Sequence, residues 1–159
     1  MAEFNVWCDP DATRVVIQSG AKVTMVPMDV TGLTAMNDAI ITQFEAMGQE
    51  SDFGRFLMAM IDFRRKNSPD LFIPVYSMFH DAVVLVYMIN PSLFTTRMTY
   101  VQLDTKSDVS YGSTVCDLNG ALGQTPNVNL VVDVDVNGYW TIVMNVLKEL
   151  SAKSKAGTL

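Results

Sequence analysis

The stretch Asn127-Val-Asn-Leu-Val-Val-Asp-Val-Asp-Val136-Asn-Gly138 decides the class of fold. Its second half alternates valine with aspartate, and this period of two predicts a strand over residues 127–136. Asn137-Gly138 predicts a turn, after which apolar side chains recur every three or four residues and predict a helix: Trp140, Val143, Met144, Leu147 and Leu150. A strand that leads directly into an amphipathic helix is typical of α/β proteins.

Upstream of this unit, the sequence predicts a first helix and a buried strand. Asp9-Pro10 has the pattern of an N-cap followed by proline at the first helical position, so we expect a helix over residues 10–19. Residues 22–30 form a β-branched, mostly apolar run that resembles a strand buried on both faces. Pro27 interrupts the run and indicates an irregular or terminal position in the sheet.

Two amphipathic helices and a long connection follow. Apolar residues recur at helical spacing in two groups, Leu33, Met36, Ile40, Phe44 and Met47, then Phe53, Phe56, Leu57, Met60 and Ile61. Between residues 64 and 79 the periodicity fades, and the connection is longer than a minimal turn. We expect this connection to be an active-site flap.

The remaining segments complete a mixed sheet. Residues 82–89 are apolar throughout, so the run suits a buried strand and a buried helix equally well. Residues 94–103 and 113–118 alternate enough to be strands. The fold class is therefore α/β, with an open mixed sheet flanked by helices. We expect a single partial domain over residues 1–159, with a frayed tail over residues 151–159.

Charge and hydropathy exclude two classes of partner. The net charge of −6 opposes binding to nucleic acid, which requires a cationic face. The longest apolar run, residues 82–89, has eight residues where a membrane-spanning helix needs roughly 20. The first residues lack the basic and apolar regions of a secretory signal, so we expect a cytoplasmic protein without membrane or nucleic-acid partners. Cys8 and Cys116 have no metal-site spacing and are expected to be buried thiols.

The strongest candidate for chemistry is the only histidine, His80, next to Asp81 at the boundary between a loop and a long apolar element. If that element is a helix, Asp81 lies in its first turn, where the helix dipole favours a carboxylate, and such junctions often carry ligand groups. The alternative is helix capping beside a partly exposed histidine.

A second candidate is the segment Glu3-Phe4-Asn5. In an extended chain Glu3 and Asn5 would point to one face, where a carboxylate and an amide together suit sugar hydroxyls. The alternative is an exposed terminal strand. Asp29-Val30-Thr31 is likewise either the edge of a site or a helix cap.

Four stretches stand in a fixed order: Ala2-Glu-Phe-Asn-Val-Trp-Cys-Asp-Pro-Asp-Ala12, Val23-Thr-Met-Val-Pro-Met-Asp-Val-Thr31, His80-Asp-Ala82 with Asn90-Pro-Ser-Leu-Phe94, and Val132-Asp-Val-Asp135 with Tyr139-Trp140. Together they resemble the C-terminal half of nucleoside hydrolases of the inosine-uridine type. The resemblance extends from Ala2 to about Leu150 and implies a Rossmann-like open sheet, one bound Ca²⁺ and a homodimer or homotetramer. It also implies hydrolysis of ribonucleosides to ribose and free base, as part of nucleoside salvage.

The resemblance assigns expected roles to individual residues. Asp81 is similar to an aspartate that binds Ca²⁺ and a ribose hydroxyl, and His80 resembles the proton donor to the departing base. Glu3 and Asn5 match a pair that binds ribose hydroxyls, and Phe4 matches a wall of the pocket. A histidine before the aspartate is similar to the inosine-uridine subgroup, whereas the purine-specific subgroup has tryptophan there.

The sequence also departs from the family pattern. The N-terminal cluster DxDPGxDD, which in the family supplies most Ca²⁺ ligands and the general base, has no match in residues 1–159. In the 64–79 connection, Tyr76 is the candidate counterpart of a tyrosine on a family helix. We therefore expect the isolated chain to be inactive. The alternative function is a non-catalytic relic that acts as an interaction module or subunit, since an incomplete sheet leaves an unpaired edge.

Overall fold

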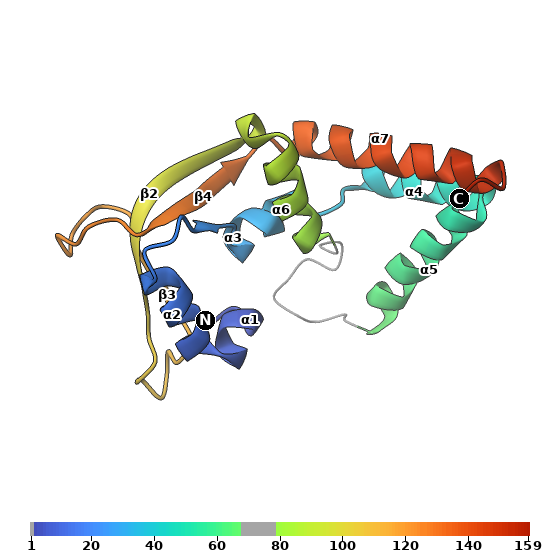
Figure 1. Ribbon diagram of the computed structural model, residues 1–159. Coiled ribbons are helices and arrows are strands. Elements are labelled where there is room, and N and C mark those ends of the chain that lie inside the picture. The colour runs from blue at the N-terminus through green and yellow to red at the C-terminus, as the bar shows by residue number, and fades with distance from the viewer. Residues whose placement is uncertain (1, 68–78) are drawn as a thin grey trace. The chain divides into compact units, whose positions relative to one another are not determined.

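The computed structural model describes residues 2–67 and 79–159 (Figure 1). The chain divides into two compact units, each made of two segments. The first unit comprises Met1–Met28 and Thr95–Asp133, and the second comprises Asp29–Phe94 and Val134–Leu159. The expected single partial domain stays a prediction. No helix within the described ranges is both long and apolar enough to cross a membrane.

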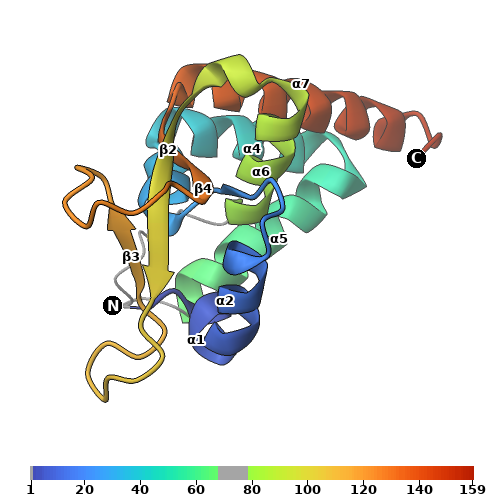
Figure 2. The same ribbon diagram turned by 60° about the vertical axis from the view of Figure 1, so that its left-hand side comes forward.

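The sheet is mixed, as predicted, and has the strand order β1-β4-β2-β3. Strand β1 (Thr24–Met25) runs parallel to β4 (Val128–Val134). Strands β2 (Phe94–Leu103) and β3 (Thr114–Asp117) are antiparallel (Figure 2). The three later strands confirm the alternation in the sequence. The long strand predicted over residues 22–30 is wrong, because β1 ends at Met25 and a helix begins at Met28. Pro27 lies between them and has no N–H for a sheet hydrogen bond.

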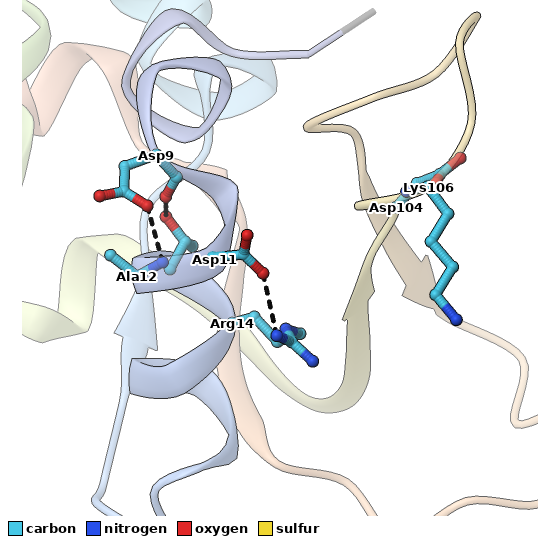
Figure 3. A network of polar contacts seen from close by, with 7 residues as sticks. Asp9, Asp11, Ala12, Arg14, Asp104 and Lys106 are labelled. Carbon is cyan, nitrogen blue, oxygen red and sulfur yellow. Dashed lines mark hydrogen bonds and ion pairs between the residues drawn. The ribbon is translucent and has the colours of Figure 1, made fainter.

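The first unit has a small apolar core beneath helices α1 (Phe4–Cys8) and α2 (Pro10–Gln18). The core is formed by Ile17, Val101, Leu103 and Val128. Figure 3 shows the predicted N-cap of α2, where the Asp9 carboxylate accepts a 2.9 Å hydrogen bond from the Ala12 N–H. Cys8 is exposed and Cys116 is half-buried, so the expectation of two buried thiols is wrong for Cys8.

A side chain extends the sheet just before β4. The Asn127 amide donates to the Val101 carbonyl at 3.0 Å, and its oxygen accepts from the Val101 N–H at 2.8 Å. The side chain thereby satisfies the same backbone groups that a neighbouring strand would satisfy. This contact fixes the start of β4 beside β2.

The second unit is helical. Its elements are α3 (Met28–Thr31), the 3₁₀ turn η1 (Gly32–Thr34), α4 (Asp38–Glu50), α5 (Asp52–Asn67), α6 (His80–Ile89), the 3₁₀ turn η2 (Pro91–Leu93) and α7 (Val136–Lys155). The two amphipathic helices predicted from the spacing of apolar residues are α4 and α5. The ambiguous run 82–89 is helical and forms most of α6. Of the expected flap, residues 64–67 continue α5, and residues 68–78, with Tyr76, lie outside the described residues.

Helices α4, α5 and α7 pack against one another (Figures 1 and 2). Their junction holds a buried pair of hydroxyls, Ser51 and Ser151, whose oxygens are 2.7 Å apart. The frayed tail expected from residue 151 is wrong in its first part, because Ser151 is buried and α7 continues to Lys155. The turn expected at Asn137-Gly138 is also wrong. Both residues lie in the first turn of α7, where the Asp135 carboxylate accepts their N–H groups at 3.1 and 3.0 Å.

An aromatic cluster forms the core beside α7. The rings of Phe44 and Phe79 stack with centroids 5.7 Å apart, and Trp140 meets both rings edge-on. Tyr139 is fully buried, and its hydroxyl donates to the Phe79 carbonyl at 3.3 Å. Burial raises the pKa of Tyr139 to about 12, although a hydrogen bond with Thr34 partly opposes this shift.

The raised pKa predicts a loss of stability in alkali. Between pH 10 and 12 the unfolded chain releases the Tyr139 proton while the folded chain retains it, so the free energy of unfolding falls as the pH rises. Relative to Tyr139→Phe, the wild-type protein should lose about 1.4 kcal/mol between pH 8 and pH 11, which urea unfolding at both pH values would measure. The prediction would be contradicted if the wild-type protein and Tyr139→Phe differed in unfolding free energy by the same amount at both pH values.

Candidate functional site

The candidate site begins at the first residue of α6. His80 is half-buried there, and its Nδ1 lies 2.8 Å from Thr31 Oγ1 on α3, which is 49 residues away in the sequence. Thr31 is only 4% exposed, so water does not compete freely for this hydrogen bond. The contact joins the Asp29-Val30-Thr31 segment to the His80-Asp81 segment within the second unit.

The other ring nitrogen of His80 has no partner in the part of the chain that the structure describes. Nε2 is buried and accepts or donates no hydrogen bond there. A buried polar atom without a partner is costly and uncommon, and it needs an explanation. Asp81, directly beside it, is exposed in the first turn of α6. His80 and Asp81 are thus the first two residues of α6, one with a buried ring nitrogen and the other with an exposed carboxylate, and their joint role in a site stays a prediction.

Buried contacts hold the residue before His80 in place. Phe79 is the N-cap of α6, and no side chain caps the helix there. Its ring packs on Phe44 and Trp140, while its carbonyl accepts the Tyr139 hydroxyl. The start of α6 is thus fixed by packing and hydrogen bonds from α3, α4 and α7.

The geometry predicted for Glu3-Phe4-Asn5 is wrong. Only Glu3 is extended (φ −67°, ψ 142°), whereas Phe4 and Asn5 open helix α1, and the Trp7 N–H donates to the Glu3 carbonyl at 2.8 Å. An alternation of three residues is too short to distinguish a strand from the first turn of a helix. Glu3 is half-buried, while Phe4 and Asn5 are exposed.

The two candidate pairs belong to different compact units. Glu3, Phe4 and Asn5 lie in the first unit, and His80 and Asp81 lie in the second. A shared sugar pocket formed by both groups stays a prediction.

The described residues do not form a complete metal site. In residues 2–67 and 79–159, no three His, Cys, Asp or Glu side chains are grouped so that they could hold a metal ion. Calcium takes six to eight oxygen ligands, and Asp81 can supply at most two. Asp29 is exposed and lies within α3, so it is not the N-cap residue that precedes the helix. The residues present do not fit a calcium ion by themselves.

Sequence reasoning missed Thr31 as a partner of His80. The sequence predicts that Asp29-Val30-Thr31 is either the edge of a site or a helix cap, and it indicates no separate role for Thr31. The threonine stands in one of the four ordered stretches, but only the packing of α3 beside α6 brings it to the histidine. The sequence signal was a polar residue at the end of an apolar run, which is also typical of a helix start.

Comparison with known proteins places the chain in a family. The sequence model described as inosine-uridine preferring nucleoside hydrolase matches residues 1–141, and the chain belongs to this family. Among curated proteins it is similar to the pyrimidine-specific ribonucleoside hydrolase RihB of Shigella flexneri, with 33% identity over 142 residues. The match covers 89% of this chain and 45% of that protein. The chain spans about half the length of the curated relatives that it matches.

Solved structures agree with the family assignment. A purine-preferring ribonucleoside hydrolase from Gardnerella vaginalis superposes with a TM-score of 0.71 and 26% identity over 94% of this chain and 47% of its own. The plant nucleoside hydrolase PpNRh1 has the same fold, with a TM-score of 0.73 and 22% identity over 92% of this chain and 47% of its own. The α/β fold predicted from the sequence is confirmed.

Proposed function

We propose that this chain provides one part of a ribonucleoside hydrolase site that splits inosine, uridine and related nucleosides into ribose and free base, for nucleoside salvage. The observation that carries the proposal is the His80-Asp81 segment at the start of α6 in a chain of this family: the buried His80 Nε2 has no hydrogen-bond partner among the described residues, and Asp81, the next residue, is exposed. The relative from Shigella flexneri is named as a pyrimidine-specific ribonucleoside hydrolase, which supports a nucleoside as the substrate of this chain.

The proposed roles follow from the charges of the reaction. Breaking an N-glycosidic bond develops positive charge on the sugar and negative charge on the base. A proton donor at the base and carboxylates near the sugar therefore stabilise the transition state. We assign His80 as the donor to the base and Asp81, Glu3 and Asn5 as ligands of the ribose hydroxyls, with Phe4 as a wall of the pocket.

Activity requires groups that residues 1–159 do not supply. The general base and most metal ligands of the family belong to the DxDPGxDD cluster, which has no match here. Asp81 would give a Ca²⁺ ion one carboxylate, and the remaining ligands would come from the part of the relatives that this chain does not match. The isolated chain should therefore not hydrolyse nucleosides.

A ribose-release assay tests these assignments. The chain alone, given inosine or uridine with Ca²⁺, should release no ribose above the background rate. The chain joined behind the unmatched N-terminal half of the Shigella flexneri relative, here named the completed hydrolase, should release ribose. Asp81→Asn should lower kcat/KM of the completed hydrolase by at least about a hundredfold, because a substrate ligand is lost.

The matched control is Asp38→Asn, which changes another exposed aspartate in the first turn of a helix of the same unit. It should leave kcat/KM within about twofold. Enzyme-like ribose release by the isolated chain would disprove the proposed dependence on residues from the half of the relatives that this chain does not match. An Asp81→Asn variant as active as the Asp38→Asn control would disprove the role of Asp81.

A second function, that of a non-catalytic interaction module, is favoured by the outer face of α6. Val83 and Val86 are buried, but the same helix exposes Val84, Leu85, Met88 and Ile89. A helix that is apolar on all sides is normally buried on all sides. The exposed face of α6, defined by these four residues, would then associate with another protein surface, for example a second copy in a homodimer or homotetramer.

Light scattering with size-exclusion chromatography tests this association. The wild-type chain should elute as an oligomer at micromolar concentration, and the double variant Leu85→Ser, Met88→Ser should shift it toward the monomer, because apolar contact area is lost. Val109→Ser is the control, since Val109 is exposed and lies outside α6. A wild-type chain that stays monomeric at all concentrations would count against self-association.

A further inference from the structure

We infer that Thr31 is a positioning residue that fixes the ring of His80 so that Nε2 is the nitrogen exchanging a proton with the nucleoside base. The inference rests on the proposed function of His80. Its structural basis is the 2.8 Å contact between Thr31 Oγ1 and His80 Nδ1, together with the buried Nε2 that has no partner in the described ranges.

The direction of the hydrogen bond follows from what each ring nitrogen can reach. In a neutral imidazole one nitrogen carries a proton and the other a lone pair. If the proton were on Nε2, a buried N–H would have no acceptor among the described residues, and orphaned N–H groups are rarer than orphaned acceptors. With the proton on Nδ1, the N–H donates to Thr31 Oγ1. The hydroxyl oxygen has two lone pairs and suits this role.

Thr31 is well placed to act as a fixed acceptor. It is 4% exposed and lies in α3, and the Thr34 hydroxyl donates to its carbonyl at 2.8 Å. Burial and this hydrogen bond to its backbone restrict where Thr31 can place its hydroxyl. The hydrogen bond that one ring nitrogen makes determines whether the other ring nitrogen carries a proton.

The same hydrogen bond serves both states of the proposed reaction. The protonated ring gives its Nε2 proton to a nitrogen of the base as the glycosidic C–N bond breaks and its electron pair passes to the base. The neutral ring left behind keeps its proton on Nδ1, where Thr31 Oγ1 still accepts it. No rearrangement of the ring is needed, which is the advantage of a preorganised donor.

Nitrogen-15 NMR of the chain tests the tautomer without any need for activity. His80 is the only histidine, so its two ring nitrogens give an unambiguous long-range correlation spectrum. In the spectrum of the neutral ring, the wild-type chain and Thr31→Ser should show the proton on Nδ1. Thr31→Val should lose this preference, because the acceptor is gone.

The control variant Thr99→Val removes another buried threonine hydroxyl, which lies on β2 in the other unit, and it should keep the Nδ1–H tautomer. A wild-type spectrum with the proton on Nε2 would overturn the inference, whether or not Thr31→Val folds. A Thr31→Val spectrum identical to that of the wild type would also overturn it.

Kinetics of the completed hydrolase give a second readout. Thr31→Val should lower kcat by about tenfold to a hundredfold, part of what a general acid contributes, with KM little changed. Thr31→Ser should restore most of kcat. An unchanged kcat in Thr31→Val would overturn the positioning role. If the wild-type completed hydrolase releases no ribose, the proposed function fails, while the tautomer experiment still decides whether Thr31 fixes the ring.

Discussion

The start of helix α6 is held by two hydrogen bonds that come from distant parts of the chain, and the candidate site depends on them. Thr31 binds the ring of His80 from α3, and Tyr139 on α7 donates to the carbonyl of Phe79. Stacking of Phe79 on Phe44 adds a third constraint from α4. A helix start fixed in this way can present His80 and Asp81 with little freedom, which is what a site that orients a sugar and a base requires.

Much of the fold could be predicted because its elements carry clear periodicities. The strand at residues 94–103 and the helix starting at Pro10 have the expected character and nearly the expected bounds. The predictions failed where a short pattern had two physical solutions. Three alternating residues at Glu3-Phe4-Asn5 fit a helix start as well as a strand, and an Asn-Gly pair after Asp135 enters a helix once the aspartate caps it.

The candidate site was predictable only in part, for a related reason. His80 and Asp81 are neighbours in the sequence, so the sequence alone indicated that both stand at the start of one element, which is α6. The contribution of Thr31 depends on how α3 packs beside α6, which no local pattern encodes. The chain belongs to the nucleoside hydrolase family but spans about half the length of its curated relatives, which agrees with the finding that residues 2–67 and 79–159 form no complete metal site.

The central claim is that the start of α6, held by Thr31 and Tyr139, is the nucleoside-facing part of the proposed hydrolase site. The most direct measurement is a crystal structure of the completed hydrolase with ribose bound. The account predicts that Asp81 contacts a ribose hydroxyl and that His80 Nε2 faces the position of the base. A ribose bound away from Asp81, with His80 Nε2 turned from the position of the base, would contradict the claim.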